Sequence, residues 1–583
     1  MSRDKYSVNS NTIASLVLGL LAALAALYFL GLDRYGLFDV DEAIFAEASA
    51  EMLESGNYIT PSYNGEPRYH KPPMIYWLQT LSMRYFDVTP LGARIPSAIL
   101  AFLSIISFYI LLEGMTRNGR LSLIATAVLG LNLSYMVLAR AAVADMALIF
   151  FSLTAAMLII SNIVSIENRI MPSVIAGFML SGALLAKGPV GLMIPAVAVG
   201  STVILYGSFR HNMKRLNIIV TVIAMLVAFI PWAKMAFDQH GVDYFNEFIM
   251  KHNLERYLGG FGNSHSQSGL YYIWVLLIGF FPWALLLPSA IWQAIRQFGG
   301  LFKSDKPEKA LALVGLLWLI TIVTFFSFSA TKLAHYIVPA LPGAALLIAW
   351  RLDQIKQTPL SIFNLIFIIP FCALFSSLFI AFKWLPQAAL GEGKLMPYIT
   401  MLSDKLQFEI PTITDPMLIS ILSQDIHISI APVMIGAILL VGTVTSFIFL
   451  TKGHLQGVTT MIATVCMAYV LLVLSIAPVA YKYMQQPLAN IGEQIKERTT
   501  DHTRVFFVSL HQPSVRFVSG VPFQAIDTPA QLRKVRPYPR HTLIAVDEEH
   551  VEETIKSIPR RIRKEKTCEG GYCLVETRYN FTR

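Results

Sequence analysis

Long apolar runs alternate with short polar segments along most of the chain. Each run is close to the length of about 20 residues that a helix needs to cross the hydrocarbon core of a bilayer. The pattern therefore predicts an all-α polytopic membrane bundle of about thirteen transmembrane helices. The predicted spans cover residues 12–32, 93–114, 121–138, 144–165, 172–186, 189–207, 217–236, 270–294, 310–328, 335–350, 360–383, 429–450 and 458–480.

The composition changes near the C-terminus. Residues 484–583 are mostly polar, and two short runs there, Val505 to Val508 and Leu543 to Val546, have the apolar, β-branched character of buried strands. A helical pattern from Glu548 to Ile558 follows them. We therefore divide the chain into a membrane domain, residues 1–483, and a small α/β domain outside the membrane, residues 484–583.

The basic residues indicate the orientation of the bundle. The chain carries 46 Lys and Arg against 37 Asp and Glu, with a net charge of +9. Most of the basic residues between spans fall in alternate short loops, whereas the other short loops hold only Arg140, Lys187 and Lys332. The positive-inside rule then predicts a multi-pass protein with a cytoplasmic N-terminus and an external C-terminal domain. This distribution explains the charge without nucleic-acid binding.

The longest loops lie on the predicted outer face, at residues 33–92, 237–269 and 384–428. The inner loops are short, so the working surface is expected to be external. The sequence contains neither a Walker A motif nor a Gly-x-Gly-x-x-Gly motif, and direct use of a nucleotide is therefore not supported.

The first outer loop, residues 33–92, carries acidic residues at the start of a predicted helix. Ile44, Ala48 and Met52 form an apolar line along residues 41–54, which predicts an amphipathic helix on the membrane surface. Asp39 or Asp41 could serve as the helix N-cap. One cap does not account for three neighbouring acids, Asp39, Asp41 and Glu42, so we expect a functional site here.

A second acid, Asp145, stands at the start of the fourth predicted span. It could simply interact with the helix dipole. A charge next to hydrocarbon is costly unless it has a partner or a function, and we favour the functional interpretation.

Cations and aromatic groups recur in the outer loops. One lysine at a helix end often only extends to the interface. Several on the face that should be poor in Lys and Arg predict a phosphate site, since Lys and Arg stabilise a phosphate by charge-assisted hydrogen bonds. The candidates for phosphate or substrate binding are Lys71, Lys187, Arg256, Lys332 and Tyr336, together with Glu42. Carboxylates can accept a proton and nearby cations can stabilise a leaving phosphate, so these groups together favour a transfer reaction at a phosphate.

Four cysteines are present. Cys372 and Cys466 lie in apolar runs, whereas Cys568 and Cys573 flank a short turn. The latter two are equally compatible with a disulfide and with free thiols. A disulfide would place the C-terminal domain in an oxidising compartment.

The sequence resembles the GT-C glycosyltransferases that use polyprenyl-phosphate sugars. The similarity is greatest to the branch of 4-amino-4-deoxy-L-arabinose lipid A transferases, with protein O-mannosyltransferases as more distant relatives. It is carried by DEAIFAEASAEMLESGNYITPSYNGEPRYHKPPMIYW, ARAAVADM, LLAKGPVGL, HNLERY and TKLAHYIVPALP.

The resemblance implies a reaction and a set of roles. An undecaprenyl-phosphate-linked sugar would be the donor and lipid A or a related glycolipid the acceptor, at the periplasmic face of the bacterial inner membrane. Asp41 would be the catalytic aspartate and Asp145 the second acid, with inversion at the anomeric carbon. Lys71 and Arg256 would hold the carrier phosphate, and Tyr336 would line the same cavity.

The chain departs from the aminoarabinose branch at two positions. Phe45 replaces a tyrosine, and His70 replaces a glutamate that is a metal-ligand candidate in the family. His70 and His252 are therefore candidate zinc ligands, although an interfacial histidine with hydrogen-bond partners is the alternative. No cofactor is required by the sequence.

Two other functions stay open. A protein acceptor would make the enzyme a protein O-glycosyltransferase. A lipid or solute transporter would normally show paired, repeated halves, which this sequence lacks.

Overall fold

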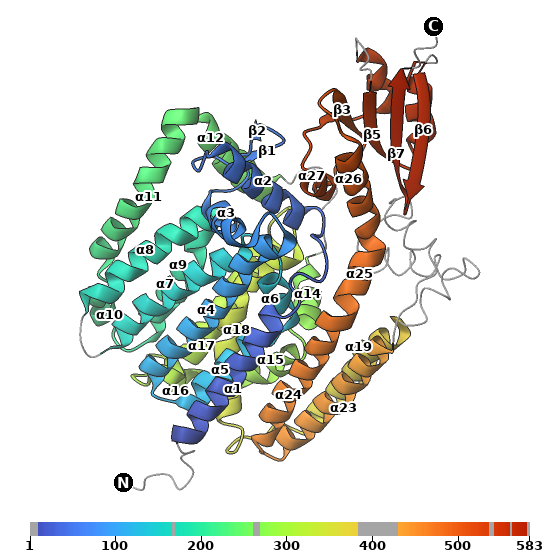
Figure 1. Cartoon of the computed structure of the whole chain (residues 1–583). Helices are drawn as coiled ribbons and strands as arrows, with labels where there is room; N and C mark the ends of the chain where they lie inside the picture. The colour runs from blue at the N-terminus through green and yellow to red at the C-terminus, as the bar shows by residue number, and fades with distance from the viewer. Residues whose placement is uncertain are drawn as a thin grey trace.

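The protein is a helical bundle with a small sheet domain at one end (Figure 1). The computed structural model describes residues 10–165, 169–259, 269–382, 430–535, 541–559 and 562–579. The start of α1 (Ser10–Phe29) and the sheet domain lie at opposite ends of the bundle (Figure 1). The predicted fold class, a polytopic α-helical bundle with a C-terminal α/β domain, is confirmed.

Within the described ranges, nine helices are long and apolar enough to cross a membrane, and two bent helix pairs raise the number to eleven. Two shorter apolar helices coincide with the remaining predicted runs, so each predicted run falls on an apolar helix. The helices are α1 (Ser10–Phe29), α4 (Pro90–Thr116), α5 (Gly119–Gly130), α6 (Leu133–Ala139), α7 (Asp145–Val164), α8 (Ile170–Lys187), α9 (Val190–Leu205), α10 (Phe209–Arg215), α11 (Ile218–His240), α14 (Tyr271–Gly279), η3 (Trp283–Leu286), α15 (Leu287–Arg296), α16 (Phe298–Leu301), α17 (Pro307–Ser327), η4 (Ala334–Ala340), α18 (Leu341–Asp353), α19 (Phe363–Phe382), α23 (Ala431–Thr451), α24 (Gln456–Leu471), η5 (Leu472–Ile476) and α25 (Ala477–Met484).

Two predicted spans are broken rather than continuous. The axes of α5 and α6 differ by 68°, because the Asn132 side chain accepts from Tyr135 N and starts a new helix there. The second pair bends by 112° between Gly279 and Trp283, next to Pro282. Proline has no N–H to donate and therefore interrupts the helical hydrogen bonds.

The first outer loop folds into α2 (Asp41–Ser55), the short strands β1 (Ser62–Tyr63) and β2 (Glu66–Pro67), and α3 (Met74–Phe86). The predicted helix is present, and most of its side chains are buried by protein. Helix α2 is buried on several sides, because it packs against α3 and against α27 (Pro513–Ser519) of the C-terminal domain. The sequence pattern could not predict this burial, because α27 is more than 450 residues away from α2 in the chain.

The second outer loop continues α11 with α12 (Asp243–Phe245), the π-helix η1 (Asn246–Glu255) and α13 (Arg256–Leu258). The third predicted outer loop, residues 384–428, lies outside the described residues.

The C-terminal domain is a five-stranded sheet with the order β4-β3-β5-β7-β6. The inner strands β3 and β5 are parallel, and β7 is antiparallel to both β5 and β6. Apolar clusters lie on both faces, as expected for an α/β layer. Cys568 and Cys573 form a disulfide across β6 and β7. The elements are α26 (Gln486–Arg498), β3 (Thr503–Val508), α27, β4 (Gln524–Ile526), η6 (Pro529–Lys534), β5 (His541–Asp547), α28 (Val551–Ser557), β6 (Ile562–Glu569) and β7 (Tyr572–Tyr579).

Candidate active site

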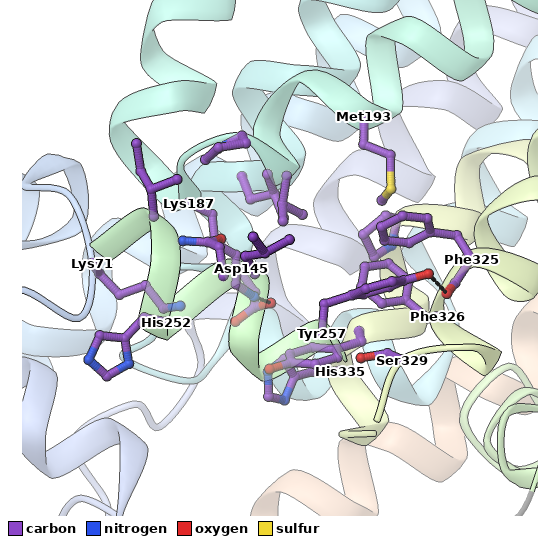
Figure 2. Close-up of a pocket in the computed structure, with 18 residues that line it drawn as sticks. Lys71, Asp145, Lys187, Met193, His252, Tyr257, Phe325, Phe326, Ser329 and His335 are labelled. Carbon is purple, nitrogen blue, oxygen red and sulfur yellow. Dashed lines mark hydrogen bonds and ion pairs between the residues drawn. The ribbon is translucent and has the colours of Figure 1, made fainter. Parts of the chain in front are cut away.

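Two adjoining cavities share part of their lining, and one of them is lined by the first residues of α2. One has a volume of about 310 Å³ and contains most of the predicted acids, and the other has a volume of about 500 Å³ and is mainly apolar. Both are lined by the same six polar residues, which form the junction of the two cavities; they are Lys71, Asp145, Lys187, His252, His335 and Tyr336. Figure 2 shows Lys71, His252, Asp145 and Lys187 gathered at one end of the apolar cavity. The polar cavity and the apolar cavity are thus adjacent, and the six shared residues lie between them.

Asp41 is the first residue of α2 and is exposed to the polar cavity. Its carboxylate makes no hydrogen bond or ion pair with any residue in the described part of the chain, and it contributes to the electrostatic environment of Tyr76 and His335. A carboxylate that is exposed and not engaged by the protein is available to accept a proton from a bound hydroxyl.

Glu42, the next residue, is engaged by the protein instead. It is buried and forms a two-point ion pair with Arg94, with distances of 2.9 Å to Nε and 2.7 Å to Nη2. It also accepts hydrogen bonds from Phe38 N at 2.9 Å and Ala142 N at 2.8 Å. The Glu42 carboxylate therefore ties the first outer loop to α4 and to the segment before α7.

Asp39 does not cap α2. Its carboxylate accepts hydrogen bonds from the backbone N–H of Ser514, at 2.8 Å, and from the Ser514 hydroxyl. Ser514 belongs to α27, so this contact links the first outer loop to the C-terminal domain. Burial raises the pKa of Asp39 to about 6, and the hydrogen bonds from Ser514 oppose that shift.

Arg516 makes a second link between these two parts. Its guanidinium lies 3.1 Å from Glu47 and 3.3 Å from Glu51, both on α2. All three side chains are buried. Burial raises the pKa of Glu47 to about 7, with a further upward contribution from the Glu51 charge that the attraction of Arg516 opposes. The two carboxylates therefore share one cation.

Asp145 begins α7 and Lys187 ends α8, and their side chains form an ion pair of 2.6 Å. Both residues are buried. The Lys187 ammonium also lies 5.5 Å from the centre of the Tyr336 ring. Asp145 therefore has a charged partner in addition to its place at the helix N-terminus, and its functional role stays a prediction.

His70 and His252 come together from two separate loops. Their ring centres are 4.0 Å apart, and His252 also lines the apolar cavity. Burial lowers the pKa of His70 to about 3, assisted by the charge of Arg68. His70 is therefore a neutral imidazole at physiological pH.

The described residues do not complete a metal site around this pair. No group of three His, Cys, Asp or Glu side chains is placed to hold one ion in that part of the chain. A resident zinc ion usually has three or four protein ligands. The described residues therefore do not by themselves form a resident zinc site, and no chemical step is assigned to a metal.

Two predicted residues are not among those that line the cavities, and one cavity residue was not predicted. Lys332 does not line either cavity, although its neighbour Leu333 lines the polar one. Arg256 begins α13, and its side chain lies outside the described part of the structure. Arg68 was not predicted but lines the polar cavity, with its Nε donating to the Tyr76 hydroxyl at 3.3 Å. Its position two residues before His70 in the same loop is the sequence signal that could have identified it.

Known proteins resemble the chain at the levels of sequence and fold. Residues 13–240 match the family of dolichyl-phosphate-mannose-protein mannosyltransferases. The undecaprenyl phosphate-alpha-4-amino-4-deoxy-L-arabinose arabinosyl transferase of Pseudomonas savastanoi is 32% identical over 57% of this chain and 60% of its own length. Arabinosyl transferase 1 of the same description from Pseudomonas fluorescens is 28% identical over 56% of each chain. The matched region thus spans between half and two thirds of these relatives.

The fold match extends over almost the whole chain. The crystal structure of ArnT from Cupriavidus metallidurans bound to undecaprenyl phosphate superposes with a TM-score of 0.73, covering 98% of both chains at 19% sequence identity. At that identity the likeness concerns the fold, including the C-terminal domain. The resemblance predicted from the short sequence motifs is confirmed by both comparisons.

Proposed function

We propose that the chain transfers a sugar from undecaprenyl phosphate to a membrane glycolipid, because its sequence is similar to undecaprenyl phosphate-aminoarabinose arabinosyl transferases and its fold is similar to that of ArnT. The sugar is 4-amino-4-deoxy-L-arabinose or a related glycosyl group, and the acceptor is lipid A or a related lipopolysaccharide precursor. The reaction takes place at the periplasmic face of the bacterial inner membrane, and the C-terminal domain lies on that side. The Cys568–Cys573 disulfide supports this orientation, because structural disulfides persist in oxidising compartments.

The observation that carries the proposal is the junction of the two cavities. The apolar cavity, lined by residues such as Met193, Phe325 and Phe326, suits a polyprenyl chain. The polar cavity, which contains Asp41, suits the sugar and the acceptor hydroxyl. A phosphate bound at their boundary lies beside Lys71 and the Asp145–Lys187 pair.

The residues then have defined roles. Asp41 accepts the proton of the acceptor hydroxyl as its oxygen forms a bond to the anomeric carbon. The bond between that carbon and the phosphate oxygen breaks, and the electron pair goes to the phosphate. Lys71 stabilises the negative charge that develops there, and Arg256 is its proposed partner. Lys187 holds Asp145 and orients the junction, while Glu42 and Asp39 keep α2 in position.

Mass spectrometry of lipids tests the proposal. Cells carrying the gene are compared with a deletion strain and with strains that express the Asp41→Asn or Glu552→Gln variant. Glu552 is an exposed residue of the C-terminal domain and serves as the control. We expect a pentose- or hexose-sized mass on lipid A to disappear in the deletion and Asp41→Asn strains and to persist in the control. A modification that persists in the Asp41→Asn strain would refute the assignment.

A protein acceptor is the second candidate, because the N-terminal part of the chain matches the protein mannosyltransferase family. It predicts an unchanged lipid profile together with the loss of a sugar from membrane or secreted proteins. If neither lipids nor proteins change, a transport function becomes the better hypothesis.

A further inference from the structure

A separate cavity of about 710 Å³ lies between α15 and the loop after α18. It is far from the active site, because η4 carries His335 and Tyr336 and α18 then rises about 15 Å between Leu341 and Arg351. Lys303 and Lys356 lie in the loops after α16 and α18, and Lys309 lies in the first turn of α17; the charge pattern assigns this end of the bundle to the cytoplasmic side. The proposed transfer reaction does not use this cavity.

Arg351 is the main polar feature of the cavity and is only 3% exposed. Its Nε donates to the Ser289 hydroxyl at 3.1 Å, its Nη1 to the Thr358 carbonyl at 2.9 Å, and its Nη2 to the Pro359 carbonyl at 3.4 Å. These acceptors are neutral, and no carboxylate among the described residues forms an ion pair with Arg351. A buried cation without a counter-charge is costly, so such a group within a membrane protein indicates a ligand site.

The nearest acid along the chain is already paired. Asp353 accepts from Arg120 at 2.5 Å and from Asn118 at 3.0 Å. It therefore does not neutralise Arg351. The cavity lining adds a second arginine, Arg296 in the last turn of α15, and contains no acidic residue. In the part of the chain that the structure describes, Arg296 likewise forms no ion pair.

The surroundings of the cavity are apolar and exposed. Trp292, which lines it, is 63% exposed, and Ile295 and Ile362, which neighbour lining residues, are 57% and 68% exposed. In a bilayer these side chains contact lipid, and tryptophan concentrates at the level of the headgroups. A ligand of this cavity can therefore place its polar part against the arginines and its apolar part against these side chains.

We infer that the cavity binds the phosphate headgroup of an anionic phospholipid from the leaflet opposite the active site. Guanidinium groups bind phosphate oxygens through paired hydrogen bonds, and basic pockets between membrane helices bind anionic headgroups. Arg351 is the buried anchor and Arg296 the exposed second contact. The hydroxyl of Ser289 and the amide of Gln293, which also line the cavity, can hydrogen-bond the glycerol part. The lipid supplies the negative charge that the protein lacks here.

A thermal-shift titration of the purified full-length protein in a non-ionic detergent tests this inference. The probes are short-chain phosphatidylglycerol, short-chain phosphatidylcholine and inorganic phosphate. We expect phosphatidylglycerol to raise the Tm by about 3 °C or more, and each of the other two probes by less than about 1 °C. An equal shift with inorganic phosphate would identify a site for soluble anions and overturn the lipid assignment. An equal shift with phosphatidylcholine would overturn specificity for an anionic headgroup.

Two matched substitutions test whether the Tm shift caused by phosphatidylglycerol arises from binding in this cavity. Arg296→Gln removes an exposed charge from the cavity, whereas Lys309→Gln removes an exposed charge at the same end of the bundle but outside the cavity. We expect the response to phosphatidylglycerol to fall by at least half in Arg296→Gln and to persist in Lys309→Gln. Equal responses in the two variants would refute the site. Arg351→Lys adds a test of the paired hydrogen bonds, and Arg296→Gln decides the question if that variant does not fold.

Discussion

The ammonium group of Lys187 lies 2.6 Å from the carboxylate of Asp145, and this ion pair joins the end of α8 to the start of α7 at the boundary of the two cavities. Both side chains are largely removed from water. The pair therefore holds two helices together and fixes one wall of the proposed phosphate site. Its contribution to stability and its contribution to the proposed reaction can be measured separately.

Removing the charge of Lys187 alone should destabilise the protein more than removing the charges of both Lys187 and Asp145. We expect Lys187→Met to lower the stability by about 3–5 kcal/mol, because Asp145 then stays buried without a counter-charge. The Asp145→Asn/Lys187→Met double variant should recover most of that loss but not the glycosyl transfer. Thermal unfolding and a transfer assay on the same preparations check both parts. A double variant that regains activity would show that the pair has only a structural role.

Asp41 and its neighbour Glu42 should behave differently when each is made neutral. Asp41→Asn is expected to lower kcat by about 10²–10⁴ with an unchanged Tm, because the carboxylate is exposed and not engaged by the protein. Glu42→Gln should lower the Tm, since it leaves the buried Arg94 without its counter-charge. Turnover and unfolding measured together separate the two roles. An Asp41→Asn variant with full turnover would exclude Asp41 as the proton acceptor.

The contact between α2 and the C-terminal domain should be more stable in mild acid. Burial raises the pKa of Glu47 to about 7 and that of Asp39 to about 6, both above their ordinary values. The folded protein therefore binds these protons more tightly than the unfolded chain does. Their contribution to stability is fully present below about pH 4, and it is lost as the pH rises through 6 and 7.

The measurement is the Tm of the wild-type protein and of Glu47→Gln between pH 5 and pH 8. Subtracting the Tm of one protein from that of the other removes the contribution of the titratable groups that both proteins contain. We expect the wild type to lose stability relative to Glu47→Gln as the pH rises. Parallel curves would contradict a raised pKa at Glu47.

The disulfide of the C-terminal domain offers a test of both stability and orientation. Removing it with Cys568→Ser/Cys573→Ser is expected to destabilise the domain by about 2 kcal/mol, because the closed loop is short. Thiol labelling of the denatured wild-type protein, taken directly from cells, should modify Cys372 and Cys466 but not the bonded pair. Labelling of all four cysteines would place the domain in a reducing compartment and contradict the proposed topology.

Much of the architecture followed from local patterns. Apolar runs of spanning length located the membrane helices, because a helix in a bilayer must satisfy its own backbone groups along its whole length. The strands around Val505 and Leu543 were identified from their apolar, β-branched runs, and both are present in the sheet. The breaks near Asn132 and Pro282 were missed, since hydropathy averaged over a window does not register a change in helix direction.

The sequence by itself determined the spans, the C-terminal domain and nearly all of the side chains that gather at the site. Only the tertiary structure decided what each of them does. Asp39, Asp41 and Glu42 are almost adjacent in the chain, yet Asp39 binds Ser514, 475 residues away, and Glu42 binds Arg94, 52 residues away, while Asp41 is left to face the cavity. The physical reason is that the availability of a carboxylate depends on burial and on hydrogen-bond partners, and folding brought those partners from distant parts of the chain.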